Sequence, residues 1–387
     1  MTVLSARLAR AYPCTVVVLA AGLVARAVLV PITHGPDFDV WDLASRATLQ
    51  GTNVYAHHPA YSGGPYAYLP LFLDIELPLQ WVAMHTGVAF SVLGKLPIVA
   101  ADAIVALLIV GHLVRRGHGD AAVAAGAGLF FLNPLVLFNG AFYGRFDSVA
   151  LAFLLLALWL YRRDGRRTWR FGAFYALSVA VKTFPIFILP WLLRRGRCTR
   201  VQLGVALVAV IGVLSAPYLL TSPVEFLRDL AVYNGSKLPG DLSWQRGLLE
   251  VASPETVRLL TYVLLAAFAV TLLALVRLDD VIVYAAVAIL LFLVASKVII
   301  EQYFLWPMPF LIVIAVDRQS RQALFTLVLV TIVGLLTNSY FDPLHPVELG
   351  VDVVLAAALT LQVVLLVRSD SAVRAPVRRK LAAATPA

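Results

Sequence analysis

Two aspartates in the first hydrophilic stretch are the strongest candidates for chemistry. Asp37 and Asp39 stand in HGPDFDVWDLASR, and Asp42 follows three residues later. Clustered carboxylates can divide their work, one acting as a general base while the other orients a partner. If a helix begins near Asp39, then Asp42 and Arg46 share one helix face with it at i+3 and i+7. The structural alternative is that acids near a helix N-terminus merely favour the helix dipole.

Cations that could stabilise a departing anion are spread over later segments. The candidates are Arg145 in a short turn, Lys297 at the end of an apolar stretch, Arg246 in a hydrophilic loop, Arg26 and Lys182 within apolar stretches, and the pair His57 and His58. Snorkelling to an interface is the alternative for the two cations within apolar segments. Asp102 and Asp352 also lie inside apolar segments, where they could be salt-bridge partners of these cations.

Aromatic residues suited to a sugar ring accompany these charges. Tyr66 and Tyr68 occur in the segment GGPYAYLPLF, and Trp244 stands two residues before Arg246. Aromatic rings offer an apolar face and Arg a bidentate fork, so such pairs suit sugars and phosphates. The same pairs also occur at plain membrane interfaces.

The composition defines the setting of these residues. The 387 residues are 61% hydrophobic and 14% charged, with a mean hydropathy of +0.86. Soluble domains carry about 25% charged residues, so the chain is predicted to be an all-α integral membrane protein. The formal charge of +9 does not indicate a nucleic-acid partner if the basic residues gather on one side of a bilayer.

Apolar runs of roughly 17–25 residues are needed to cross the hydrocarbon core. The predicted crossings are 13–33, 95–114, 121–138, 147–161, 201–220, 257–276, 281–296, 303–316, 323–340 and 348–367. Two further apolar stretches, 66–88 and 171–194, contain prolines that break or bend helices. The stretch 13–33 could instead be a cleaved signal peptide, although its length and Arg26 favour a retained helix.

The positive-inside rule predicts on which side of the membrane the ends of these segments lie. All basic clusters and both termini become cytoplasmic if 66–88 lies at the interface and 171–194 enters and leaves on one face, broken near Lys182. The competing topology, in which both stretches cross, puts basic clusters on opposite sides. The preferred topology leaves the outer loops 34–94 and 221–256 with an excess of acids. Residues 1–367 are expected to form one membrane domain, and 368–387 a disordered basic cytoplasmic tail.

Four stretches together resemble the GT-C membrane glycosyltransferases. They are the first outer loop from its D-x-D to PYAYLPLF, then FFLNPLVLFNGAFYGRFDSVALAFLLLALWLYRR, FYALSVAVKTFPIFILPWLL and SKVIIEQYFLWPMPFL. The order and content are similar to the polyprenyl-phosphate mannosyltransferases of actinobacteria and to the catalytic subunit of the GPI first mannosyltransferase. The resemblance implies about 10–12 transmembrane helices and an interfacial helix in the first outer loop.

The resemblance also implies an activity. A sugar, most often mannose, would move from a polyprenyl-phosphate donor to a glycolipid or cell-wall glycan at the extracytoplasmic face, with inversion. It makes Asp37 the general base, with Asp39 second, and puts donor contacts at Arg145 and Lys297. The remaining sugar-binding or acceptor-binding candidates are Asp42, Tyr66, Tyr68, Asp147, Trp244, Gln302 and Tyr303. Neither a cofactor nor a metal is expected.

Three other hypotheses about the function remain open at this point. A transporter or flippase of a lipid-linked sugar would bind the same ligand without chemistry, although inverted repeats are missing from the sequence. An arabinofuranosyltransferase of the same fold would share the phosphate and the lipid. An accessory membrane subunit would leave the clustered loop acids unexplained.

Overall fold

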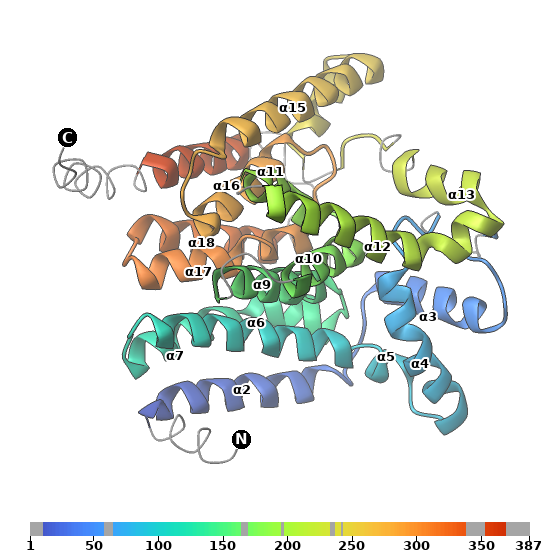
Figure 1. Cartoon of the computed structure of the whole chain (residues 1–387), viewed down its shortest axis with the longest axis horizontal. Coiled ribbons are helices and arrows are strands. Elements are labelled where there is room, and N and C mark those ends of the chain that lie inside the picture. The colour runs from blue at the N-terminus through green and yellow to red at the C-terminus, as the bar shows by residue number, and fades with distance from the viewer. Residues whose placement is uncertain are drawn as a thin grey trace. The chain divides into compact units, whose positions relative to one another are not determined.

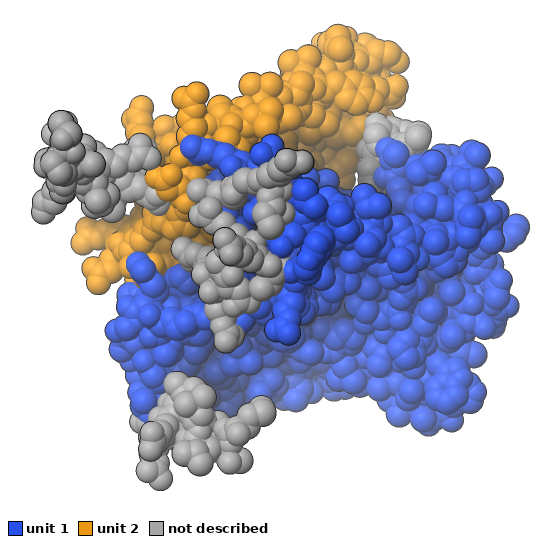
Figure 2. Space-filling model, viewed as in Figure 1, with its two compact units in different colours: residues 1–237 blue, residues 238–387 orange. Residues whose placement is uncertain are grey.

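The computed structural model describes residues 11–57, 65–163, 169–194, 197–232, 237–240, 243–337 and 353–368 (Figure 1). Within these ranges every regular element is a helix, which confirms the predicted all-α class. The chain divides into two compact units, Met1–Lys237 and Leu238–Ala387 (Figure 2). The expectation of a single domain over 1–367 stays a prediction, and the tail beyond residue 368 lies outside the described residues.

Unit 1 is a helical bundle with a smaller group of helices at one end. Its elements are α2 (Pro13–Leu29), α3 (Pro36–Leu49), α4 (Leu71–Thr86), α5 (Phe90–Leu93), α6 (Leu96–Arg115), α7 (Asp120–Phe131), α8 (Pro134–Leu137), η1 (Phe138–Phe142), α9 (Asp147–Arg163), α10 (Trp169–Val181), η2 (Phe184–Ile188), α11 (Leu189–Leu193), α12 (Arg197–Thr221), α13 (Pro223–Leu227) and η3 (Arg228–Val232). Packing runs in the order α2, α7, α6, α9, α10, α12, while α3 packs on α4 (Figure 1).

Unit 2 contains the remaining helices. They are η4 (Trp244–Glu250), α15 (Pro254–Leu275), α16 (Val281–Ala295), η5 (Glu301–Leu305), α17 (Met308–Asp317), α18 (Arg321–Leu336) and a last helix, Val353–Arg368. Most side chains of α16 and α17 are buried, so these two helices form the core of the unit. α16 packs on both α15 and α17.

Helix length and composition confirm a polytopic membrane protein. Phe90–Arg115, Thr199–Thr221 and Pro254–Leu275 are each long and apolar enough to cross a bilayer. Asp120–Phe131 and Pro134–Phe142 pass the same test together, as one span bent by 44°. Six shorter apolar helices accompany them in the described residues. α4 is absent from this group, and its interfacial position stays a prediction.

The long apolar helices expose large aliphatic side chains. On α12, Val208, Val213 and Leu220 are each at least 73% exposed, and Leu259 and Val270 on α15 are about two-thirds exposed. Soluble proteins rarely expose contiguous apolar surface of this kind. The acyl chains of a bilayer are the natural cover for it.

The prolines of the stretch 171–194 break the helix where the sequence predicted. α10 ends at Val181, and the chain passes through Lys182 into η2, with Pro185 in its first turn. Pro185 has no N–H to continue an α-helical ladder, and its carbonyl accepts a hydrogen bond from the Tyr175 hydroxyl at 2.9 Å. Backbone freed by a break at membrane depth is tolerated when it is buried in protein, and Lys182 is 8% exposed.

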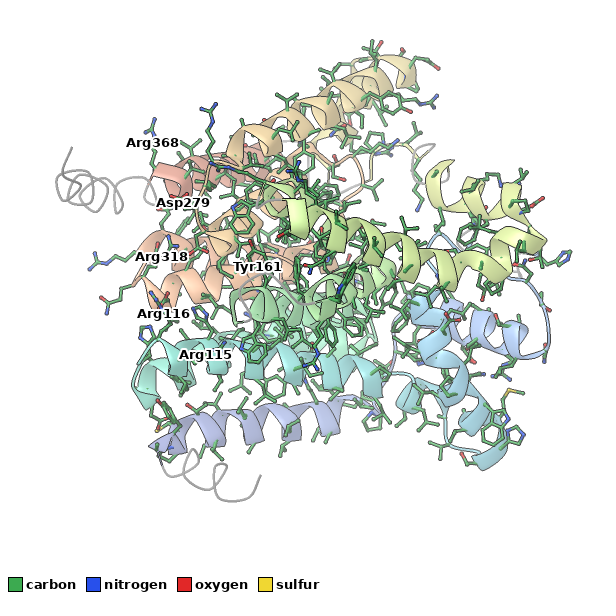
Figure 3. The ribbon with its side chains drawn as sticks, in the orientation of Figure 1. Arg115, Arg116, Tyr161, Asp279, Arg318 and Arg368 are labelled. Atoms are coloured by element: carbon green, nitrogen blue, oxygen red, sulfur yellow. The ribbon has the colours of Figure 1, made fainter. Side chains whose placement is uncertain are left out.

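α6 separates the two ends of unit 1. Its 20 residues correspond to about 30 Å, the thickness of the hydrocarbon core. Arg115 and Arg116 lie at one end of it, opposite the end of the unit that carries α3 and α4 (Figure 3). Within unit 2, Asp279, Arg318 and Arg368 likewise lie at one end (Figure 3).

A fully buried ion pair joins α2 to α6. Arg26 Nε lies 3.0 Å from Asp102 Oδ2, and neither side chain is exposed. Arg26 also donates to the Phe131 carbonyl at 2.6 Å, and Ser148 Oγ donates to the other Asp102 oxygen. Asp102 is therefore the partner of a buried cation, one of the roles that the sequence left open for it.

The pair predicts an asymmetric response to mutation. Asp102→Ala leaves the Arg26 guanidinium buried without its counter-charge, which costs about 3–5 kcal/mol of unfolding free energy. The double variant Arg26→Met with Asp102→Ala removes both charges, so it is expected to be more stable than Asp102→Ala alone. Thermal unfolding in detergent measures the order, and wild-type stability of Asp102→Ala would contradict it.

Candidate active site

Four charged residues from three parts of unit 1 meet at the end that carries α3. Arg145 Nε lies 3.5 Å from Asp37 Oδ2, and Lys182 Nζ donates to Asp147 Oδ1 at 2.7 Å. The charges of Asp37 and Arg145 both act on Lys182. These four residues, the Asp37 cluster, were all candidates from the sequence, and the structure brings them together.

The N-terminus of α3 holds Asp37 in position. Gly35 is the N-cap and Pro36 opens the first turn, where proline costs no hydrogen bond. The Gly35 N–H donates to the Tyr143 carbonyl at 3.0 Å. A Cβ on Gly35 would lie 2.5 Å from the Tyr143 ring, so only glycine allows this approach.

A buried lysine ties the neighbouring segments together. Lys95 Nζ donates to the carbonyls of Val30 at 2.9 Å and Phe142 at 2.8 Å, and also to that of Thr33. The acceptors come from the end of α2, the loop before α3 and the end of η1. Lys95 thus joins the segment that precedes Asp37 to the one that precedes Arg145, and sequence reasoning did not single it out.

Arg145 follows an irregular turn. η1 is a π-helix, a form often found at functional sites, and Gly144 has a φ of +81°. A Cβ on Gly144 would lie 2.4 Å from Phe38, which adds a close approach to the left-handed conformation. Arg145 then donates to the Asn139 side chain at 3.3 Å. The turn directs the guanidinium toward α3.

Aromatic rings form a wall beside the Asp37 cluster. Phe146, between Arg145 and Asp147 in the chain, stacks on Phe72 with ring centroids 4.0 Å apart. It also contacts Trp41 of α3 and Tyr68, at 5.0 and 5.2 Å, and Lys182 Nζ lies 5.1 Å from its centroid. Tyr68 is half-buried and Tyr66 fully buried, so Tyr68 has the more accessible ring.

Burial differs sharply within the Asp37 cluster. The Asp37 side chain is 48% exposed, whereas those of Arg145, Lys182 and Asp147 are 10% exposed or less. The accessible group is therefore a carboxylate backed by two partly desolvated cations. Such an arrangement can accept a proton from one ligand while cations stabilise negative charge on another.

The second acid of the D-x-D faces elsewhere. Asp39 Oδ1 lies 3.0 Å from His34 Nε2, and Asp42 pairs with Arg46 at 3.1 Å. Positions two apart on a helix are about 200° apart around its axis, so Asp37 and Asp39 project to opposite sides. The predicted common face of Asp39, Asp42 and Arg46 is confirmed by their presence around one cavity.

Unit 2 gathers the other candidates around the end of α16. The Trp244 indole donates to the Val294 carbonyl at 2.8 Å, and Gly240 N–H donates to the Lys297 carbonyl at 2.9 Å. Lys297 and Gln302 are buried, and Tyr303 stacks on Trp306 at 4.1 Å. Burial lowers the pKa of Lys297, and the charge of the nearby Arg258 makes a smaller contribution in the same direction. Arg246 is exposed on η4.

Three candidates stand outside these groups. Arg26 is occupied by Asp102 in the bundle core, so we do not include it in the proposed site. His57 is exposed. His58 lies outside the described residues.

Glu76 on α4 is a buried acid beside the site. It is 1% exposed, and neither carboxylate oxygen has a hydrogen-bond partner in the described residues. Burial, with a smaller contribution from the charge of Asp42, raises the pKa of Glu76 well above its ordinary value. Burial likewise raises the pKa of Asp74 to about 6.

A family model matches the central part of the chain. The model of glycosyltransferase family 87 matches residues 66–296, more than half of the chain. The chain therefore belongs to glycosyltransferase family 87.

Curated relatives are similar at low identity. GPI mannosyltransferase 1 of Gibberella zeae is 30% identical over 40% of this chain and 32% of its own length. A protein of Mycolicibacterium smegmatis, named as a polyprenol-phosphate-mannose-dependent alpha-(1-2)-phosphatidylinositol mannoside mannosyltransferase, is 26% identical over 75% of this chain and 71% of its own. Its namesake from Mycobacterium tuberculosis is 27% identical over 45% of this chain and 44% of its own. The match thus spans about a third of the fungal relative and under half of the tuberculosis one.

The raised pKa of Glu76 predicts a pH-dependent stability. Above the ordinary value of 4.5, the unfolded chain loses the Glu76 proton while the folded chain keeps it. The free energy of unfolding therefore falls as pH rises toward the folded-state pKa. Glu76→Gln stays neutral throughout, so its melting temperature should fall less between pH 5 and pH 8 than that of the wild type. The exposed Glu250→Gln serves as the control, and equal slopes for wild type and Glu76→Gln would contradict the expectation.

Proposed function

We propose that the protein is an inverting mannosyltransferase that uses a polyprenyl-phosphate donor and a glycolipid or cell-wall glycan acceptor. The observation that carries the proposal is the Asp37 cluster, in which an accessible carboxylate lies against Arg145 with Lys182 behind it. The names of the two mycobacterial relatives support a polyprenyl-phosphate donor and mannose as the sugar.

The chemistry follows from the residue types. Asp37 accepts the proton of an acceptor hydroxyl, and the acceptor oxygen forms a bond to the anomeric carbon. The bond from that carbon to the phosphate oxygen breaks, and its electron pair leaves with the polyprenyl phosphate. Such transfers pass through an oxocarbenium-like state. Arg145 and Lys182 stabilise the charge that develops on the departing phosphate, and Asp147 orients Lys182.

Asp37 is a better general base than Asp39 in this arrangement. Its carboxylate is the one that contacts a cation suited to the donor phosphate, because Arg145 lies 3.5 Å away. The Asp39 carboxylate pairs with His34 and projects away from that side of α3. We therefore assign the base to Asp37 and binding to Asp39.

We further propose that the site faces the extracytoplasmic side. Asp37 lies on α3, and α3 is at the end of unit 1 opposite the basic pair Arg115 and Arg116 (Figures 1 and 3), about a hydrocarbon thickness away along α6. Basic residues favour the cytoplasmic side, so both termini are assigned to the cytoplasm. The sequence-based expectation that Lys297 binds the donor phosphate stays a prediction.

The direct test is transfer by variants of the first-loop acids. In nanodiscs with radiolabelled polyprenyl-phosphate mannose and octyl α-mannoside, Asp37→Asn should lose at least about a hundredfold in turnover, the usual contribution of a general base. Asp39→Asn should lose less, and through the acceptor KM. Both variants should keep the wild-type melting temperature.

Three outcomes would contradict the proposal. Full turnover by Asp37→Asn would exclude it as the base. Preference for polyprenyl-phosphate arabinose would identify an arabinofuranosyltransferase. Movement of the donor across the bilayer with no new glycosidic bond would identify a flippase.

A further inference from the structure

One buried carboxylate contacts both ends of the chain segment that carries Arg145. Asp102 on α6 accepts a hydrogen bond from Ser148 Oγ through its Oδ1. Its other oxygen, Oδ2, lies against Gly140, where an added Cβ would come within 2.7 Å of it. Residues 140–148 run from η1 into the first turn of α9. Asp102 therefore touches this connection where it begins and where it ends.

Arg26 of α2 holds the carboxylate in place. Its Nε lies 3.0 Å from Asp102 Oδ2, and the guanidinium also donates to the carbonyls of Gly22 at 3.1 Å and Phe131 at 2.6 Å. It lies 3.8 Å from the centroid of the Phe131 ring. Arg26 and Asp102 are fully buried, and Ser148 is 1% exposed. A rotation of the carboxylate would break its bonds to both α2 and α9.

From Ser148 the contacts lead to Lys182. Ser148 is the second residue of α9 and follows Asp147. Asp147 Oδ1 accepts a hydrogen bond from Lys182 Nζ at 2.7 Å, and the Asp147 side chain is 1% exposed. The bond between Ser148 and Asp102 thus holds the first turn of α9, which carries the partner of Lys182.

From Gly140 the contacts lead to Arg145. Asn139, the residue before Gly140, is 1% exposed. Its side-chain oxygen accepts from Arg145 Nη1 at 3.3 Å, and its backbone carbonyl accepts from the Arg145 N–H at 2.8 Å. η1 packs on α6, so the contact of Gly140 with Asp102 lies one residue from the support of Arg145.

The ion pair between Arg26 and Asp102 lies where charges are costly. Asp102 is part of the apolar span Phe90–Arg115. Apolar side chains of similar volume in place of a buried ion pair are often neutral or stabilising, and ionisable groups within transmembrane helices are commonly functional. Stability alone therefore does not account for this pair.

We propose that Arg26 and Asp102 are positioning residues for the donor phosphate. They touch no reacting atom. They hold the connection from η1 to α9, and this connection positions Arg145 and the pair of Asp147 with Lys182 beside the phosphate. The proposal rests on the proposed function, which assigns the phosphate to these two cations.

Binding of farnesyl phosphate, a short-chain polyprenyl phosphate, tests the contacts through Ser148. The full-length protein in nanodiscs is titrated by calorimetry, in which the stoichiometry reports the folded fraction and the Kd reports the site. Ser148→Ala should raise the Kd by about tenfold or more, the effect of a weakened hydrogen bond to a charged group, with unchanged stoichiometry. Ser148→Thr keeps a hydroxyl, so its Kd should stay within about threefold of the wild-type value.

The matched control is a second buried serine of unit 1. The Ser178 hydroxyl donates to the Tyr175 carbonyl within its own helix, α10, at 2.6 Å. Ser178→Ala removes a buried hydroxyl of the same size, and its Kd should stay within about twofold of the wild-type value.

Gly140→Ala tests the contacts at the other end. The added Cβ displaces either η1 or the Asp102 carboxylate, so the Kd for farnesyl phosphate should again rise by about tenfold. Gly111→Ala, on the same helix as Asp102, places its Cβ in open space and should leave the Kd within about twofold. Arg26→Met with Asp102→Ala should keep a raised Kd even where its melting temperature exceeds that of Asp102→Ala, because the contacts of the carboxylate are still missing.

The outcomes separate this proposal from the proposed function. A wild-type Kd in Ser148→Ala or in Gly140→Ala would overturn the positioning role, while sugar transfer that depends on Asp37 would leave the function standing. Raised Kd values in both variants, without transfer by the wild type, would support the positioning role and overturn the function. No binding of farnesyl phosphate by the wild type, or a Kd that follows the melting temperature across all variants, would also overturn the positioning role.

Discussion

The contact between Asp37 and Arg145 is the interaction on which the candidate site depends. The two residues come from segments more than a hundred positions apart, and Arg145 lies between helices rather than in one. Lys95 binds carbonyls on both segments, and the Gly35 N–H reaches the Tyr143 carbonyl. Backbone groups outside regular structure must find partners when they are buried. The site is therefore held by the same bonds that satisfy the irregular backbone between helices.

The cations and the carboxylate of the Asp37 cluster differ in their exposure to solvent. Arg145 and Lys182 are withdrawn from water beside aromatic rings, where charge interactions are stronger than in bulk solvent. Asp37 remains accessible to a second ligand. Asp37 and Asp39 of the D-x-D project to opposite sides of α3, Asp37 toward Arg145 and Asp39 toward His34. The spacing of two residues on a helix is enough to produce that separation.

Sequence reasoning succeeded where a local rule applied. Prolines located the helix break at Lys182, and helical spacing located Asp39, Asp42 and Arg46 on one face. It missed Lys95, because its contacts are with carbonyl groups that only folding brings near. It predicted that Arg26 binds the donor phosphate, whereas in the folded chain Arg26 forms an ion pair with Asp102 in the core. The hydrogen bond from Trp244 to the Val294 carbonyl also joins segments 50 residues apart. The periodicity of the sequence does not predict such a long-range contact.

The most direct test of the central claim is a structure of the Asp37→Asn protein in nanodiscs with a polyprenyl-phosphonate mannose analogue. The carbon that replaces the bridging oxygen prevents transfer, so the bound donor can be observed. We predict density for the phosphorus beside Arg145 and Lys182, with the anomeric carbon directed toward residue 37. A donor headgroup at the end of unit 1 that carries Arg115 and Arg116, or one with no contact to Arg145, would contradict the claim.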